Sequence, residues 1–335
     1  MRHLSTVLSI AAAGAALLAV PALAQTKPDA GASEGPAQSA LTVGALQIGS
    51  HANLDVAGFD INVARDKIVY SYFLKNTGPS ELALAAAVSL PDLRASADNS
   101  ETWTLATSDP ENPVGLTVTA AGAPVTTKAE VHAFALGLDR LAEIKAERLP
   151  LIPFGPQTDK ALAALTPEAV DQLAALGIVS PPDPTQPKTP PSADWSLEVV
   201  QSWRLVLPPG KTTPVTVRFT PVKAEYQLAK GDEQDIEDMK DDLCLTPSAL
   251  SALEARLKGG GALAATEISL ADDAPTRWLD TPTPTLSVQK PRPDAIVAFC
   301  GMDEKTAGKP TVLGAAPDDR ENNELRIAIF EPAAK

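Results

Sequence analysis

The sequence contains only two cysteines and three histidines among its 335 residues. Histidine is the usual general base near neutral pH, and groups of cysteine or histidine are the usual ligands of structural zinc. No His-Glu-x-x-His segment is present, so the common zinc-protease motif is lacking as well. We therefore expect no catalytic residue set, no metal site and no cofactor, and the sequence favours a protein that is not an enzyme.

Positive charge is also scarce, with 28 lysines and arginines against 42 aspartates and glutamates and a formal net charge of −14. This excess of negative charge repels the phosphate backbone of nucleic acids, so we expect no nucleic-acid partner. Only 4% of the residues are aromatic, which argues against an extended aromatic binding surface. After residue 24 no apolar run approaches the ~20 residues of a membrane span, and we expect no transmembrane segment.

The first 24 residues are typical of a secretory signal peptide. A basic start at Arg2 leads into an apolar run over residues 4–20, and small residues form a cleavage site that ends at Ala24. We predict cleavage after Ala24 and a periplasmic or secreted mature chain. Residues 25–40 are rich in Gly, Ala, Ser and Pro without an apolar period, which predicts a disordered lead-in.

The two cysteines, Cys244 and Cys300, favour a structural disulfide, because an even count in an oxidising compartment is typical of bridged thiols. The chain-entropy estimate for a loop of this length is about 4 kcal/mol of stabilisation. A redox pair or a pair of metal ligands is the alternative. Neither a Cys-x-x-Cys spacing nor a neighbouring histidine supports that alternative.

Two regions show the alternating pattern of β-strands, residues 41–127 and 192–335. The first region predicts paired strands over 54–76, a strand over 82–90, and short strands at 103–105 and 116–118. In the second region Trp195 and Trp203 share one face of a strand over 195–207. We expect both in the core rather than on a sugar-stacking platform, and a return strand over 215–219 that completes a hairpin.

Helical periods occur over residues 128–180 and 232–258. Apolar residues spaced by three or four predict an amphipathic helix from about 128 to 147. The next helix has Thr166 as N-cap, Pro167 in its first turn and Gly177 as its stop. Residues 181–191 are rich in proline and predict a stiff, extended connector.

Residues 232–242 contain seven carboxylates. Their order does not match a calcium-binding loop, and at helical spacing they are the solvated face of a helix. A catalytic pair of carboxylates, as in glycosidases, stays an open alternative, because such pairs are defined by separation in space rather than in sequence.

These elements predict a mainly β (α+β) fold with β-sandwich-like layers and two helical insertions, arranged as one domain or two.

Several short segments, in their order and spacing, resemble the exported bacterial family catalogued as domain of unknown function 4424. They comprise residues 75–77, 90–92, 149–155, 203–211, 244–245 and 298–301, together with the spacing of Leu162, Leu165, Leu173 and Gly177. The resemblance implies export and supplies no activity, substrate, cofactor or catalytic residue. It does place Cys244 and Cys300 where family members have cysteines. Residues 25–40 differ from the N-terminal segment that is typical of the family.

Export, β architecture and missing catalytic sets lead to one main hypothesis, a non-catalytic binding or interaction module of the cell envelope whose ligand or partner the sequence leaves unknown. The alternative is a carboxylate-dependent hydrolase acting on an envelope polymer, which would need two carboxyl groups about 5 to 9.5 Å apart in a cleft. A third hypothesis is a purely structural envelope component.

Overall fold

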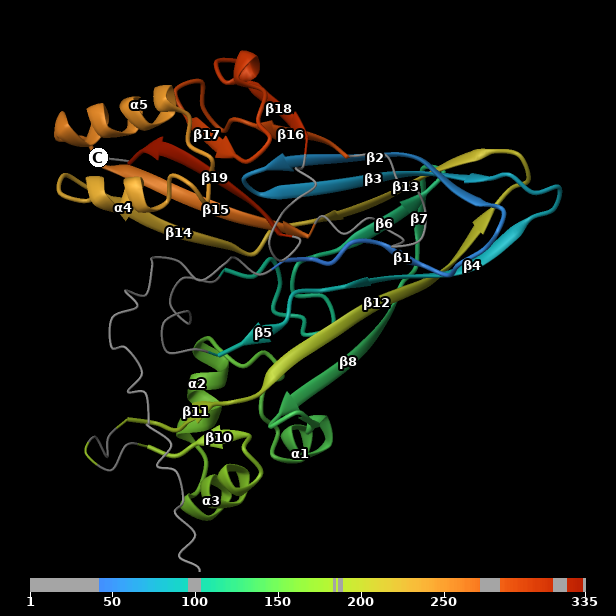
Figure 1. Cartoon of the computed structure of the whole chain (residues 1–335). Coiled ribbons are helices and arrows are strands. Elements are labelled where there is room, and N and C mark those ends of the chain that lie inside the picture. The colour runs from blue at the N-terminus through green and yellow to red at the C-terminus, as the bar shows by residue number, and fades with distance from the viewer. Residues whose placement is uncertain are drawn as a thin grey trace, which may run out of the picture. The chain divides into compact units, whose positions relative to one another are not determined.

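The computed structural model describes residues 42–95, 104–182, 185, 189–271, 284–315 and 324–333. Within these residues the chain forms layered β-sheets and five α-helices (Figure 1). The predicted class, a mainly β fold with sandwich-like layers, is confirmed. The expected signal peptide at 1–24, the lead-in at 25–40 and part of the connector at 181–191 lie outside the described residues.

One sheet has six strands in the order β1-β4-β12-β8-β9, with β5 also paired to β12. Its long central strand is antiparallel to β4 and to β8 on its two sides. The strands are β1 (Gln47–Ile48), β4 (Leu82–Ser89), β5 (Leu93–Arg94), β8 (Lys128–Ala135), β9 (Leu138–Asp139) and β12 (Ser196–Leu207).

A second sheet has seven strands in the order β18-β16-β2-β3-β13-β6-β7. Apolar side chains from this sheet and from the six-stranded sheet form the largest core, which includes the buried Tyr70, Val88 and Leu205. The strands are β2 (Leu54–Ala64), β3 (Lys67–Asn76), β6 (Thr117–Ala120), β7 (Ala123–Val125), β13 (Thr212–Phe219), β16 (Thr285–Gln289) and β18 (Thr311–Ala315).

A four-stranded sheet, in the order β14-β15-β19-β17, carries the second helical insertion. Ile236 and Leu253 of its helices pack with apolar residues of the sheet in a separate core. Helices therefore do occur within residues 232–258, as the sequence predicts. The elements are β14 (Lys223–Leu228), α4 (Glu233–Asp238), α5 (Pro247–Lys258), β15 (Leu263–Ala271), β17 (Ile296–Phe299), a 3₁₀ turn (Glu304–Thr306) and β19 (Glu324–Pro332).

A third core is formed by the first helical insertion and a two-stranded sheet. The Thr166 hydroxyl accepts a hydrogen bond from the Ala169 amide at 3.2 Å, and Gly177 has a φ of 70°, so the predicted cap and stop are confirmed. The elements are α1 (Leu141–Ala146), α2 (Pro156–Ala163), α3 (Pro167–Ala175), β10 (Val179–Ser180) and β11 (Ser192–Ala193).

The helix predicted from residue 128 to 147 is wrong over most of its length. Residues 128–135 form β8, a tight turn leads into β9, and only α1 is helical. Residues 128–134 pair with Ser196–Ser202 of β12, and this ladder outweighs the local spacing of apolar residues.

The hairpin predicted from 195 to 219 is also wrong, because β12 and β13 lie in different sheets. Residues 208–211 carry the chain from one sheet to the other. Trp195 and Trp203 are nonetheless buried, with exposed fractions of 1% and 6%, which confirms that they belong to the core. Of the short strand expected at 103–105, Trp103 lies outside the described residues and Leu105 is in a loop.

Candidate functional site

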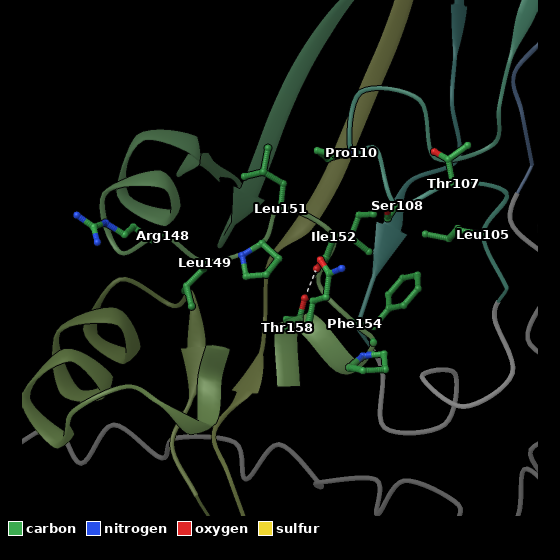
Figure 2. A pocket seen from close by; sticks show the side chains of 14 residues that line it. Leu105, Thr107, Ser108, Pro110, Arg148, Leu149, Leu151, Ile152, Phe154 and Thr158 are labelled. Atoms are coloured by element: carbon green, nitrogen blue, oxygen red, sulfur yellow. Dashed lines mark hydrogen bonds between the residues drawn. The ribbon is translucent and has the colours of Figure 1, made fainter. Parts of the chain in front are cut away.

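A cleft of about 560 Å³ lies between two loops, the one that precedes β6 and the one that joins α1 to α2 (Figure 2). The wall formed by the α1–α2 loop is mainly apolar, and the other wall adds Leu105 and Pro110 beside Thr107 and Ser108. Several of the apolar side chains are only partly buried, so they present apolar surface to the cleft. The apolar lining consists of Leu105, Pro110, Leu149, Pro150, Leu151, Ile152, Phe154 and Pro156.

Two buried side chains hold the loop that joins α1 to α2. The Trp195 indole N–H donates to the Leu151 carbonyl at 2.8 Å, and the Thr158 hydroxyl donates to the Ile152 carbonyl at 2.7 Å. Trp195 and Thr158 are each 1% exposed, so water has little access to the two donor groups. The carbonyl groups are therefore fixed, and the side chains of this loop keep a constant direction relative to the cleft.

The same loop is restrained at its ends and within its length. Arg148 has a φ of 57° and Gly155 a φ of 94°, a region that residues with a side chain seldom adopt. Pro150 and Pro153 have φ angles fixed by their rings. A loop with so few accessible conformations loses little entropy when a ligand binds.

The opposite wall is held together by hydrogen bonds among residues 107–116. The Thr107 hydroxyl donates to the Asn112 carbonyl at 2.9 Å, and the Asn112 side-chain oxygen accepts from the Leu116 amide at 2.7 Å. From β12, the buried Gln201 donates to the Glu111 carbonyl at 2.6 Å. This wall is therefore anchored to the six-stranded sheet as well as closed on itself.

The cleft can bind by burying apolar surface, and it offers little for acid–base chemistry. None of the residues that line it is Asp, Glu, His, Cys or Lys. Arg148 is the one charged lining residue, and in Figure 2 its side chain points away from the other labelled side chains. The Thr107 and Thr158 hydroxyls already donate to carbonyls of the protein.

A second hollow, of about 490 Å³, lies beside β5, β8 and β12 and is more polar. Asp194 and Glu198 are among its lining residues, and Asp194 accepts a hydrogen bond from the Ser180 hydroxyl at 2.5 Å. Arg94, which also lines it, pairs with Asp92. Two carboxylates therefore line this hollow, whereas none lines the apolar cleft.

The structure joins Cys244 and Cys300 in a disulfide with a Cα–Cα distance of 4.9 Å. It connects the segment between α4 and α5 to the residue that follows β17. Among the described residues no cysteine is free. The backbone of Cys244 has a φ of 48°, a left-handed conformation that residues other than glycine seldom adopt.

Several carboxylates of residues 232–242 are paired with protein groups. Asp242 bonds Arg326 at 2.9 Å, Glu237 bonds Lys240 at 3.0 Å, and Asp238 accepts from Gln234 at 2.7 Å. No group of three His, Cys, Asp or Glu residues suited to a metal ion occurs in the part of the chain that the structure describes. The predicted helix face covers only part of these acids, because α4 ends at Asp238, and Asp241 and Asp242 lie in the turn that follows.

Sequence reasoning missed a buried network beneath α4. Glu267 of β15 is 2% exposed, accepts from the Tyr226 hydroxyl at 2.5 Å and bonds Arg326 at 2.6 Å. Burial, followed by the charge of Glu267, raises the pKa of Tyr226 far above its usual range. Because Arg326 also bonds Asp242, the network fastens the α4–α5 segment to the sheet. A glutamate within the apolar run of β15 was the available signal.

The cleft residues were also not identified as a site from the sequence. Their signal was the proline-rich apolar segment at 149–156, which stands between two helices and was noted only for its family resemblance. Its partners, Trp195 and residues 105–110, are distant in the sequence, and periodicity does not reveal such contacts.

The fold and the cleft define a layered β protein with a preorganised apolar pocket and a disulfide-linked helical insertion. The family model described as Domain of unknown function (DUF4424) matches residues 37–319, and the chain belongs to this family. No curated protein sequence matches the chain.

Two solved structures show limited similarity. A "putative nutrient binding protein" from Legionella pneumophila has a TM-score of 0.41 and 10% identity, with 87% of this chain and 71% of that chain covered. An M1 zinc metallopeptidase mutant from Deinococcus radiodurans has a TM-score of 0.25 and 12% identity, with 83% of this chain and 42% of that chain covered. Neither likeness carries an argument about function.

Proposed function

We propose that the mature chain is a non-catalytic binding protein of the bacterial cell envelope, and that a small, largely apolar ligand occupies the cleft between residues 105–110 and 148–158. The observation that supports this most is an apolar lining held by hydrogen bonds from the buried side chains of Trp195 and Thr158. The volume of about 560 Å³ falls within the range of about 300 to 1,000 Å³ that small-molecule sites have.

The physical basis of binding is removal of apolar surface from water, which contributes about 25 cal/mol per Å². Leu105, Ile152 and Phe154 are partly buried in the protein and expose the rest of their side chains. A ligand that covers them gains this free energy, and the restrained loop adds little conformational cost.

The envelope location is supported by the leader over residues 1–24, which has the composition of a signal peptide. The disulfide between Cys244 and Cys300 supports it independently, because such bonds persist in oxidising compartments. No helix in the described ranges is long and apolar enough to cross a membrane.

The hydrolase alternative gains no support from the apolar cleft, since none of its lining residues is a carboxylic acid. The purely structural alternative predicts no pocket, whereas this cleft is walled by two restrained loops.

A neutral fluorescent probe, N-phenyl-1-naphthylamine, tests the cleft. The wild-type protein should bind it saturably, and Ile152→Asp should weaken binding by at least about tenfold, the equivalent of about 1.4 kcal/mol. Leu313→Asp is the matched control, because Leu313 is 42% exposed on β18 and does not line the cleft. Circular dichroism establishes that both variants are folded. Equal weakening by the two variants, or no saturable binding by the wild type, would count against the proposal.

A further inference from the structure

β8 has one paired side and one side that is largely open (Figure 1). Along one side Lys128–Phe134 pairs with β12, whereas on the other side only Phe134 and Ala135 pair with β9. No other strand in the described residues pairs with β8. Residues 128–132 therefore form an open strand edge, which is the kind of surface that accepts an added strand.

The register identifies which backbone groups point outward. Leu136 and Gly137, with φ angles of 50° and 75°, form a two-residue turn, so Ala135 directs its N–H and C=O groups toward β9. Every second residue repeats that direction, and the Ala133 carbonyl indeed accepts from the Arg140 amide at 2.6 Å. Ala129 and Val131 follow the same pattern.

In contrast, the Lys128 carbonyl faces β12, where it accepts from the Ser202 hydroxyl at 3.3 Å. For Ala129 and Val131 the described part of the chain supplies no backbone partner on the outward side. Four backbone groups, two N–H and two C=O, are thus available along this edge.

Three carboxylates lie around the edge, together with the exposed Lys128 at the start of β8. The Glu130 side chain is 70% exposed, the Asp139 side chain is 41% exposed, and Glu198 is exposed opposite His132 in the register. The hydrogen bonds that the His132 ring donates to the carboxylates of Asp139 and then Glu130 raise its pKa, as expected beside negative charge. A cationic side chain at this edge would therefore be favoured.

Apolar surface adjoins the edge at the tip of the hairpin. Leu136 is 80% exposed and Leu138, in β9, is 55% exposed. An added strand that lies end to end with β9 can extend apolar residues over Leu138, so the edge offers apolar contact beside its acidic groups.

We propose that the open edge of β8 binds an extended, basic segment of a partner protein as an additional β-strand. The backbone groups of Ala129 and Val131 pair with the segment, and Glu130 and Asp139, which border the open side, attract its cationic side chains. A second copy of this chain fits less well, because each copy carries a net charge of −14 and the two repel one another. This surface is separate from the proposed ligand cleft.

The test uses a short synthetic peptide of alternating lysine and valine, with a glutamate–valine peptide of the same length as its control. Only the basic peptide should bind to the wild-type protein. Glu130→Lys should weaken its binding about threefold or more, whereas Glu81→Lys, the same charge change at an exposed position before β4, should leave it unchanged.

Amide hydrogen exchange followed by NMR supplies a readout specific to strand addition. The peptide should slow exchange at Ala129 and Val131 and leave Glu130 and His132, which already face β12, unaffected. Three results would overturn the proposal: no binding of the basic peptide, binding without protection of these two amides, or protection that depends on the concentration of the protein alone. The last result would indicate a second copy as the partner.

Discussion

At the scale of single residues, buried donors determine the shape of the cleft. The Trp195 indole and the Thr158 hydroxyl each bond a carbonyl of the loop that joins α1 to α2. An intramolecular hydrogen bond contributes about 0.5 to 1.5 kcal/mol net, so each bond disfavours alternative loop conformations by roughly that amount. Together with the restrained backbone at Arg148 and Gly155, these two bonds fix the side chains of this wall.

His132 gives a prediction at the same scale. Its ring bonds Asp139 at 2.8 Å and Glu130 at 3.3 Å, and these carboxylates raise its pKa above the ordinary value of 6.5. The protonated ring therefore stabilises the folded state below pH 6.5, and this contribution is lost as the pH rises through the raised pKa. An NMR titration of the ring protons should give a pKa above 6.5.

Two variants separate the causes of this shift. Asp139→Asn should remove most of the rise in the pKa of His132, because the bond to Asp139 is its largest cause, and Glu130→Gln should remove less. A wild-type ring that titrates at or below 6.5 would contradict the account of the acidic edge.

At the scale of elements, the disulfide and the buried network fasten the same segment. Cys244 is bridged to the end of β17, and nearby Asp242 is joined through Arg326 to Glu267. The α4–α5 segment is thus held at two points that are independent in chemistry, one covalent and one electrostatic.

Removing the bridge tests the first of these attachments. The bridge spans a sequence separation of 56 residues, for which the chain-entropy estimate is about 4 kcal/mol. The double variant Cys244→Ser, Cys300→Ser should lose roughly that free energy of unfolding in urea, and a reductant should destabilise the wild type to a similar extent. A reductant that leaves the wild-type midpoint unchanged would show that the bridge does not stabilise the fold.

Elements with strong local signals, and the pairing of the adjacent strands β2 and β3, could be predicted from the sequence, whereas pairings between distant strands could not. Turn residues and periodicity predict the N-cap at Thr166, the strands β2 to β4 and the helices within 232–258. Residues 128–135 carry apolar spacing compatible with a helix, and only the ladder with β12 makes them a strand. Likewise, nothing local to residues 208–211 distinguishes a hairpin from a passage between sheets.

At the scale of the whole molecule, contacts between distant segments create both the core and the site. β16 pairs in parallel with β2, and the Trp195 indole reaches a carbonyl 44 positions earlier in the chain. Alternating patterns predicted the layered class, whereas the order of strands and the cleft between residues 105–110 and 148–158 depend on these long-range contacts. The family resemblance identified the family but assigned no functional site.

Native mass spectrometry of the protein released from the bacterial envelope tests the central claim most directly. The account predicts a chain that begins at Gln25, contains the Cys244–Cys300 disulfide and carries a small molecule that dissociates on denaturation. A chain that retains Met1, or an envelope-derived protein that carries no ligand, would contradict it.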